Sequence, residues 1–143
     1  MTPEDLQLIE SDAGRVTDEA DAFATVFYST LFELDPSARR LFTTDMAEQR
    51  RKLTDELAVL VGLGLEASRS GLDGFERRAG ALGRRHRRYG VTSRHYDTVG
   101  VALLAALRRR LPDWNDERER AWTRLYTLVA DVMQEATAPG DDS

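Results

Sequence analysis

Two histidines are the side chains of this sequence best suited to bind a metal ion, and their settings differ. His86 follows apolar residues at alternating spacings of three and four, so its imidazole lies on the apolar face of a helix. The residues of that stripe are Leu72, Phe75, Ala79, Leu82 and, beyond the histidine, Tyr89. A buried imidazole either forms a hydrogen bond within the core or binds a metal ion. We expect His86 to be buried and His95, which lies beside charged residues near a helix boundary, to be exposed.

Two further polar side chains, Tyr28 and Gln49, interrupt apolar stripes on other helices. Their apolar neighbours at helical spacing are Ala24, Leu31 and Phe32 for Tyr28, and Met46, Leu53 and Leu57 for Gln49. A buried hydroxyl or amide costs roughly 1–3 kcal/mol when nothing satisfies it, so three polar groups on three helices favour a shared polar ligand such as dioxygen on iron. The alternatives are a core tyrosine whose hydroxyl reaches the surface and a glutamine at an exposed helix edge.

The elements that would position these groups are all helical. Apolar residues recur at three- and four-residue spacing instead of alternating, which predicts an all-α chain. The predicted helices cover, approximately, residues 2–14, 17–34, 36–42, 45–67, 72–89, 93–111 and 115–137. The expected N-caps are Thr2, the segment Thr43 to Asp45, Ser93 and Asn115, and the expected left-handed C-cap is Gly90.

Composition excludes several classes of function. The 143 residues fit one domain, predicted over 1–137, with 138–143 as a disordered tail. The absence of cysteine excludes disulfides, thiolate catalysis, iron–sulfur clusters and cysteine-based zinc sites. A net charge of -5 disfavours nucleic acid and anionic membranes as partners, and the dispersed arginine pairs are expected to be solvated. The polar, acidic N-terminal segment and the short apolar runs predict a soluble, cytoplasmic protein with no membrane span.

The segments that carry the polar groups resemble the globin domains of bacterial single-domain haemoglobins and flavohaemoglobins. The matching residues are Phe27 to Phe42, Gln49 with Leu53, His86 to Val91, Tyr96, Val99-Gly100, Ala121-Trp122, Tyr126 and Ala130 to Val132. The resemblance extends from the first helix to about Ala136. It implies the globin fold, a helical sandwich around a haem pocket in which helices cross at roughly 50°.

The resemblance also implies a haem b cofactor with iron and a role for individual residues. His86 would be the only protein ligand of the iron, and Phe42 would pack against the haem face. Tyr28 and Gln49 would donate hydrogen bonds to dioxygen on the opposite, distal side. The apolar pocket would be lined by Met46, Leu53, Leu57, Leu82, Val91, Val99 and Leu103. Lys52 and Arg85 would meet the haem propionates, or else lie in solvent as ordinary exposed cations.

Two departures from the resembling proteins limit the chemistry that we expect. In the flavohaemoglobins a late-helix carboxylate joins a tyrosine like Tyr96 in bonding the proximal imidazole. Here Thr137 stands at the matching position and Glu135 is two residues short of it, so strong electron donation to the iron is not expected. There is also no flavin domain and no dinucleotide-binding motif; Gly80 and Gly83 are expected to permit close packing or a soft proximal helix.

Four functions stay open on the sequence alone. The first is tight, reversible dioxygen binding at a ferrous haem that is five-coordinate without gas, because His95 lies on the wrong element to be a second ligand. The second is nitric oxide dioxygenation with a separate reductase as partner. The third, gas sensing, would normally need an output domain, and the fourth is a haem-free helical scaffold. Tyr28, Gln49 and His86 make dioxygen binding the leading hypothesis, but the sequence does not separate it from nitric oxide dioxygenation, and the oligomeric state stays open between monomer and homodimer.

Overall fold

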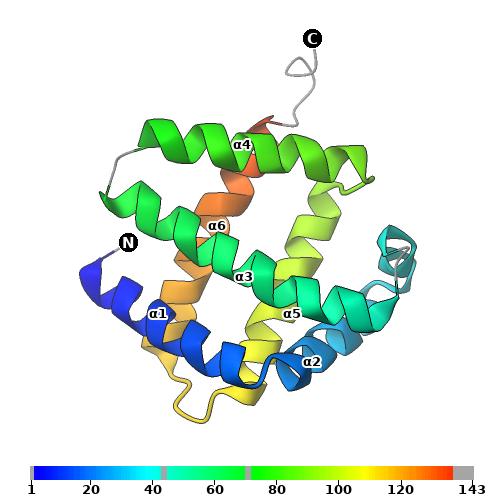
Figure 1. The fold of residues 1–143 in the computed structure, drawn as a ribbon, viewed down its shortest axis with the longest axis horizontal. Helices are drawn as coiled ribbons and strands as arrows, with labels where there is room; N and C mark the ends of the chain where they lie inside the picture. The colour runs from blue at the N-terminus through cyan, green and yellow to red at the C-terminus, as the bar shows by residue number, and fades with distance from the viewer. Residues whose placement is uncertain (1, 43–44, 70–71, 137–143) are drawn as a thin grey trace.

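The computed structural model describes residues 2–42, 45–69 and 72–136, and in these ranges the chain is helical with no strand. The elements are α1 (Pro3–Asp18), α2 (Ala20–Leu34), the 3-10 helix η1 (Pro36–Leu41), α3 (Met46–Arg69), α4 (Leu72–Arg88), α5 (Ser93–Arg110) and α6 (Asp116–Ala136) (Figure 1). The predicted all-α class is confirmed. The predicted tail at 138–143 lies outside the described residues, and none of the described helices is both long and apolar enough to span a membrane.

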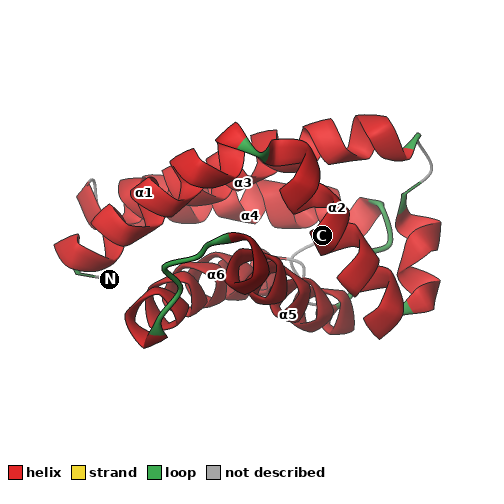
Figure 2. Ribbon diagram, turned by 90° about the horizontal axis from the view of Figure 1, so that it is seen from below, coloured by secondary structure: helices red, strands yellow, loops and turns green. Residues whose placement is uncertain are grey.

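The helices form a two-layer sandwich. Seen from the side, α1, α3 and α4 lie in one layer and α5 and α6 lie in the other (Figure 2). The most extensive contacts between helices are those of α2 with α5 and of α4 with α6. The α4–α6 contact joins the two layers directly. The largest fully buried side chains include Trp122, Phe23, Phe75, Leu31 and Leu107. The core therefore lies between the layers, and α3 and α4 pack against each other at its edge.

The helix boundaries agree with the predicted order but differ in detail. α1 continues four residues past Gly14, where the sequence predicted its end. The reason is that Val16 lies one turn beyond Asp12 and is buried with it, so packing extends the helix through the glycine. Pro36 begins a helix as predicted, although its geometry is the tighter 3-10 type and it ends at Leu41.

Three helix ends carry the capping residues that the sequence predicted. Thr2 and Asp5 form a reciprocal capping box, with both backbone N–H groups 3.1 Å from the opposing side-chain oxygens. Asn115 accepts from the backbone N–H of Arg118 at 2.9 Å, as an N-cap should. Gly90 adopts the left-handed conformation, with φ +91°, just past the end of α4. These three predictions are confirmed, whereas Thr43 and Thr44 of the fourth predicted cap lie outside the described residues.

The start of α5 corrects two predictions. The N-cap is Thr92 and not Ser93, which is already the first helical residue. The Thr92 backbone N–H donates to Nδ1 of His95 at 2.9 Å, and Nε2 of the same ring lies 3.8 Å from a carboxylate oxygen of Asp35. The side chain of His95 is consequently only 13% exposed, so the prediction that it would be exposed is wrong. Both ring nitrogens are engaged in the local structure.

A buried carboxylate ties α1 to α6. Asp12 is fully buried, and one of its oxygens accepts from the indole N–H of Trp122 at 3.0 Å. The other oxygen accepts from Nε of Arg118 at 3.1 Å, and that arginine side chain is 15% exposed. Because the charge is paired and hydrogen-bonded on both oxygens, its burial is tolerated. The network holds α6 against the opposite layer.

Candidate functional site

His86 is the imidazole that the site is built around. It lies on the last turn of α4 and is half-buried, so the prediction that it would be buried is only partly correct. Its Nδ1 lies 2.8 Å from the backbone carbonyl oxygen of Leu82. Because a carbonyl oxygen can only accept, the proton of this contact lies on Nδ1, and the neutral tautomer of the ring therefore has its lone pair on Nε2. A neutral imidazole with a free Nε2 is the form that binds a metal ion.

The apolar stripe of α4 ends at this histidine. Phe75 and Ala79 are fully buried, and Leu82 and His86 are half-buried. Tyr89, predicted as the next member of the stripe, is 66% exposed because α4 ends at Arg88 and the chain turns away. The side chain of Leu72 lies outside the description. Burial along the stripe therefore decreases toward the end of α4, where His86 lies.

Tyr28 approaches the site from α2. The residue is 5% exposed and its ring packs edge-on against Phe42, with the ring centroids 5.3 Å apart. Its hydroxyl donates to the backbone carbonyl oxygen of Gln49 across a long 3.3 Å. The hydroxyl therefore lies toward α3 instead of reaching the surface. Burial, and to a smaller extent the carboxylate of Glu56, raises the pKa of the Tyr28 phenol, so it keeps its proton at neutral pH.

The residues predicted to surround the ligand come from different elements. Leu53, Leu57 and Leu103 are buried, whereas the remaining apolar members are only half-buried: Phe42, Met46, Leu82, Val91 and Val99. Gln49 is half-buried in the first turn of α3, where the sequence had left an exposed helix edge as the alternative. Large apolar side chains that stay partly open beside a half-buried imidazole are suited to an apolar ligand with a metal centre.

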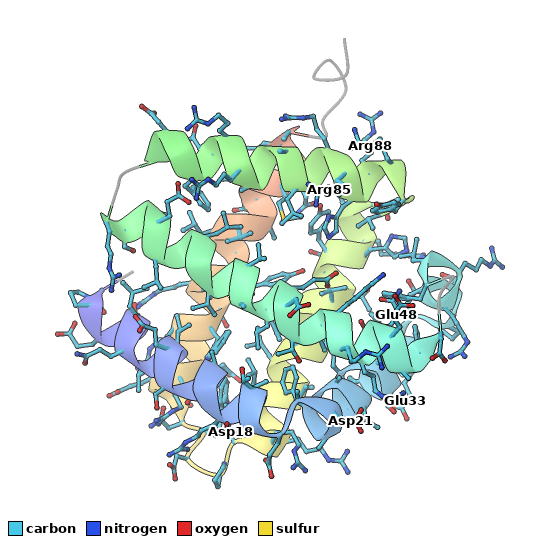
Figure 3. The ribbon with its side chains drawn as sticks, viewed as in Figure 1. Asp18, Asp21, Glu33, Glu48, Arg85 and Arg88 are labelled. Carbon is cyan, nitrogen blue, oxygen red and sulfur yellow. The ribbon has the colours of Figure 1, made fainter. Side chains whose placement is uncertain are left out.

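The cations predicted at the propionates lie at the edge of the site. Lys52 is 49% exposed, and its Nζ lies 3.8 Å from the carboxylate of Glu48. Arg85 is exposed near the end of α4, at the top of the view in Figure 3, whereas Glu48 lies lower, at the right. Both positions agree with exposed cations; Lys52 lies on α3, and Arg85 lies on α4 next to His86 in the sequence.

Tyr96 carries a polar atom that the described protein does not satisfy. The residue is 7% exposed, its hydroxyl has no hydrogen-bond partner among the described residues, and burial raises its pKa. Its backbone carbonyl accepts from the hydroxyl of Tyr126 at 2.6 Å, which fixes the start of α5 against α6. Glu135 is exposed, and Thr137 lies outside the described residues. An unsatisfied buried hydroxyl fits a site that is completed by a further group.

Glu56 belongs to the site although the sequence reasoning did not single it out. Its side chain is exposed, yet burial by the surrounding protein raises the pKa of its carboxyl above the ordinary 4.5. His86 and Lys52 oppose this shift electrostatically, so the carboxyl lies within range of the imidazole. Glu56 follows Gln49 by seven residues, two helical turns, and that spacing was the available signal.

Glu56→Gln should change how stability depends on pH. A raised carboxyl pKa means that the folded protein favours the protonated form of Glu56. The contribution of this group to the free energy of unfolding is therefore fully present below about pH 4.5 and is lost as the pH rises through the folded pKa. Glutamine imitates the protonated carboxyl. We expect the variant to match the original protein in acid and to exceed it at neutral pH, as measured by urea unfolding across that range. Glu48→Gln is the control, and a stability difference independent of pH would contradict the assignment.

Comparisons with known proteins agree with this architecture. The Globin family model matches residues 25–133. An anaerobic nitrite reductase of Gossypium hirsutum is 31% identical over 124 residues, which cover 78% of this chain and 76% of the relative. The flavohemoprotein of Vibrio cholerae is 26% identical over 137 residues, and the match covers 93% of this chain but only 34% of that protein. Ferric Aplysia limacina myoglobin superposes with a TM-score of 0.75 at 17% identity, covering 96% of this chain and 99% of that one.

Proposed function

This chain belongs to the globin family, whose members bind haem b, and on that premise we propose that it binds dioxygen tightly and reversibly at ferrous haem iron. The observation that carries the proposal is the 2.8 Å contact between Nδ1 of His86 and the Leu82 carbonyl. It directs the lone pair of Nε2 away from its own helix. Haem, when bound, supplies an iron atom with one position for this imidazole and one for a gas.

His86 would hold the iron of a bound haem through Nε2. The hydrogen bond to the Leu82 carbonyl favours the tautomer whose lone pair is on Nε2 and restrains the orientation of the ring. His95, the only other histidine, is engaged with Thr92 and Asp35 and is not available as a second ligand. The proposal therefore includes a five-coordinate ferrous state in the absence of gas.

Tyr28 and Gln49 act on the distal side. The phenol of Tyr28 retains its proton because burial raises its pKa. Its hydrogen bond to the Gln49 carbonyl oxygen is weak, because the two oxygens are 3.3 Å apart. A gas that acquires negative charge is a stronger acceptor than a backbone carbonyl, so the hydroxyl can turn to it. Leu53 and Leu57, both buried on α3, exclude water and so strengthen that hydrogen bond. Slow release of dioxygen is the consequence.

An absorption spectrum of the purified protein tests the proposal. We expect a haem band, a five-coordinate high-spin ferrous spectrum after dithionite, and a stable, reversible change on addition of oxygen. A protein that takes up no haem when haem is supplied would end the proposal. A six-coordinate low-spin ferrous spectrum without gas would contradict the assignment of one protein ligand.

Tyr28→Phe should accelerate the release of dioxygen by roughly 10- to 100-fold. A hydrogen bond to a charged acceptor is worth about 1.5–3 kcal/mol, and each 1.4 kcal/mol is a factor of ten. The measurement is the dissociation rate by stopped-flow displacement with carbon monoxide. Tyr126→Phe is the matched control, because it removes a tyrosine hydroxyl that bonds the Tyr96 carbonyl outside the distal side. Equal dissociation rates in Tyr28→Phe and the original protein would remove the role given to Tyr28.

Nitric oxide dioxygenation is the second candidate and uses the same side chains. What supports it is the match to a flavohemoprotein over about a third of that protein's length. Any such turnover would require a separate reductase to restore ferrous iron. Nitric oxide consumption through many turnovers with an added reductase would favour the enzyme, whereas one stoichiometric burst would favour the binder.

A further inference from the structure

α4 packs tightly against the backbone of α6 at Gly83, a glycine one turn before His86. A Cβ atom built on Gly83 would lie 2.3 Å from the carbonyl oxygen of Met133 and 2.7 Å from its Cα atom. These are backbone atoms of a helix, which cannot rotate aside as the end of a flexible side chain can. Any side chain at this position therefore separates the two helices by about 1 Å before ordinary van der Waals contact is restored.

α4 is the helix that would move. α6 is held near the contact by Val129 and Met133, both buried, and earlier in the helix by the hydrogen bond from Trp122 to the buried carboxylate of Asp12. α4, by contrast, presents Leu82 and His86 on its site-facing side, and both are only half-buried. The C-terminal half of α4 is therefore less firmly packed than α6 and is the part that shifts more easily.

The direction of that shift matters for His86. Successive residues of an α-helix are rotated by about 100°, so the His86 side chain leaves α4 at about 60° from the direction in which Gly83 faces Met133. A movement of α4 away from Met133 therefore withdraws the imidazole along its own direction by about half the movement. The ring cannot compensate freely, because its Nδ1 is bonded to the carbonyl of Leu82 on the same helix.

We propose that Gly83 is a positioning residue: by letting α4 settle on the backbone of α6 at Met133, it sets how far His86 extends Nε2 toward the haem iron. The proposal rests on the function proposed above, in which His86 is the iron ligand. The contact between Gly83 and Met133 would then do more than pack two helices, because it would determine the strength of the bond between iron and His86. A larger residue at position 83 should weaken that bond without touching the haem.

Gly83→Ala and Gly80→Ala form a matched pair on the same helix. A Cβ on Gly80 would meet only the Cβ of Ala136 at 3.4 Å and a guanidinium nitrogen of Arg84 at 3.5 Å, which are ordinary contacts. We expect the iron–histidine stretching frequency of the ferrous haem protein, measured by resonance Raman spectroscopy, to fall in Gly83→Ala and to stay unchanged in Gly80→Ala. We also expect nitric oxide to detach the imidazole in a larger fraction of Gly83→Ala.

The same substitution in a His86→Gly background, with imidazole supplied, separates positioning from a general disturbance. Free imidazole is not tied to α4, so Gly83→Ala should leave the iron–imidazole frequency unchanged there. An unshifted frequency in the single variant, or a shift that persists with free imidazole, would overturn the proposal. Loss of helical circular dichroism in Gly83→Ala alone would also overturn it, by making Gly83 a folding requirement. If the original protein binds no haem, the function proposed above fails instead.

Discussion

Replacing His86 with glycine should lower the affinity for haem by at least about 100-fold, and added imidazole should restore a five-coordinate ferrous spectrum. Removing a residue that only orients a metal-binding side chain lowers metal affinity by about 10- to 100-fold. We expect a larger loss of haem affinity here, because the metal-binding side chain itself is removed. The remaining apolar contacts, such as Phe42 and Leu103, cannot replace a coordinate bond. Titration of the purified protein with haem, followed at the haem absorption band, measures the loss.

His95→Gly is the matched control for this prediction. It removes the only other histidine of the chain, whose ring bonds Thr92 and faces Asp35. We expect this variant to lose some stability at the start of α5 while it keeps its haem and its ferrous spectrum. If His86→Gly retained the original spectrum without imidazole, or if His95→Gly lost it, the assignment of the iron ligand would be wrong.

Asp12→Ala should destabilise the protein by about 3–5 kcal/mol. Removing one partner of a buried ion pair leaves the other charge uncompensated, and here the indole N–H of Trp122 is left unsatisfied as well. Domains of this size are stable by only about 5–15 kcal/mol, so the loss is a large fraction of the total. Urea unfolding of the purified protein, followed by circular dichroism, gives the free energy of unfolding.

Asp21→Ala provides the comparison. Asp21 also forms an ion pair with an arginine of another helix, Arg50, at 2.9 Å, but its side chain is 83% exposed. Exposed pairs contribute about 0–1 kcal/mol because water screens them. We expect Asp12→Ala to cost several times more than Asp21→Ala. Similar losses in the two variants would show that the buried network does not hold α1 to α6 as described.

Much of the local structure could be predicted from the sequence. The capping residues Thr2 and Asn115 and the left-handed Gly90 are found as expected, because each acts through backbone groups within four residues of itself. The errors arise where distant parts of the chain meet. Gly14 does not end α1, because Val16 is buried in the core, and His95 is not exposed, because Asp35 of another element lies against it.

The sequence by itself determined that His86 faces inward, because helical periodicity is a local property that spacing alone reveals. Only the tertiary structure decided what that position can do. In the folded chain the hydroxyl of Tyr28 donates to α3, and the carboxyl of Glu56 interacts electrostatically with the imidazole of His86. Gly83 packs against the backbone of Met133. These partners lie between 21 and 50 residues apart in the chain, and packing between helices, not local pattern, selects them.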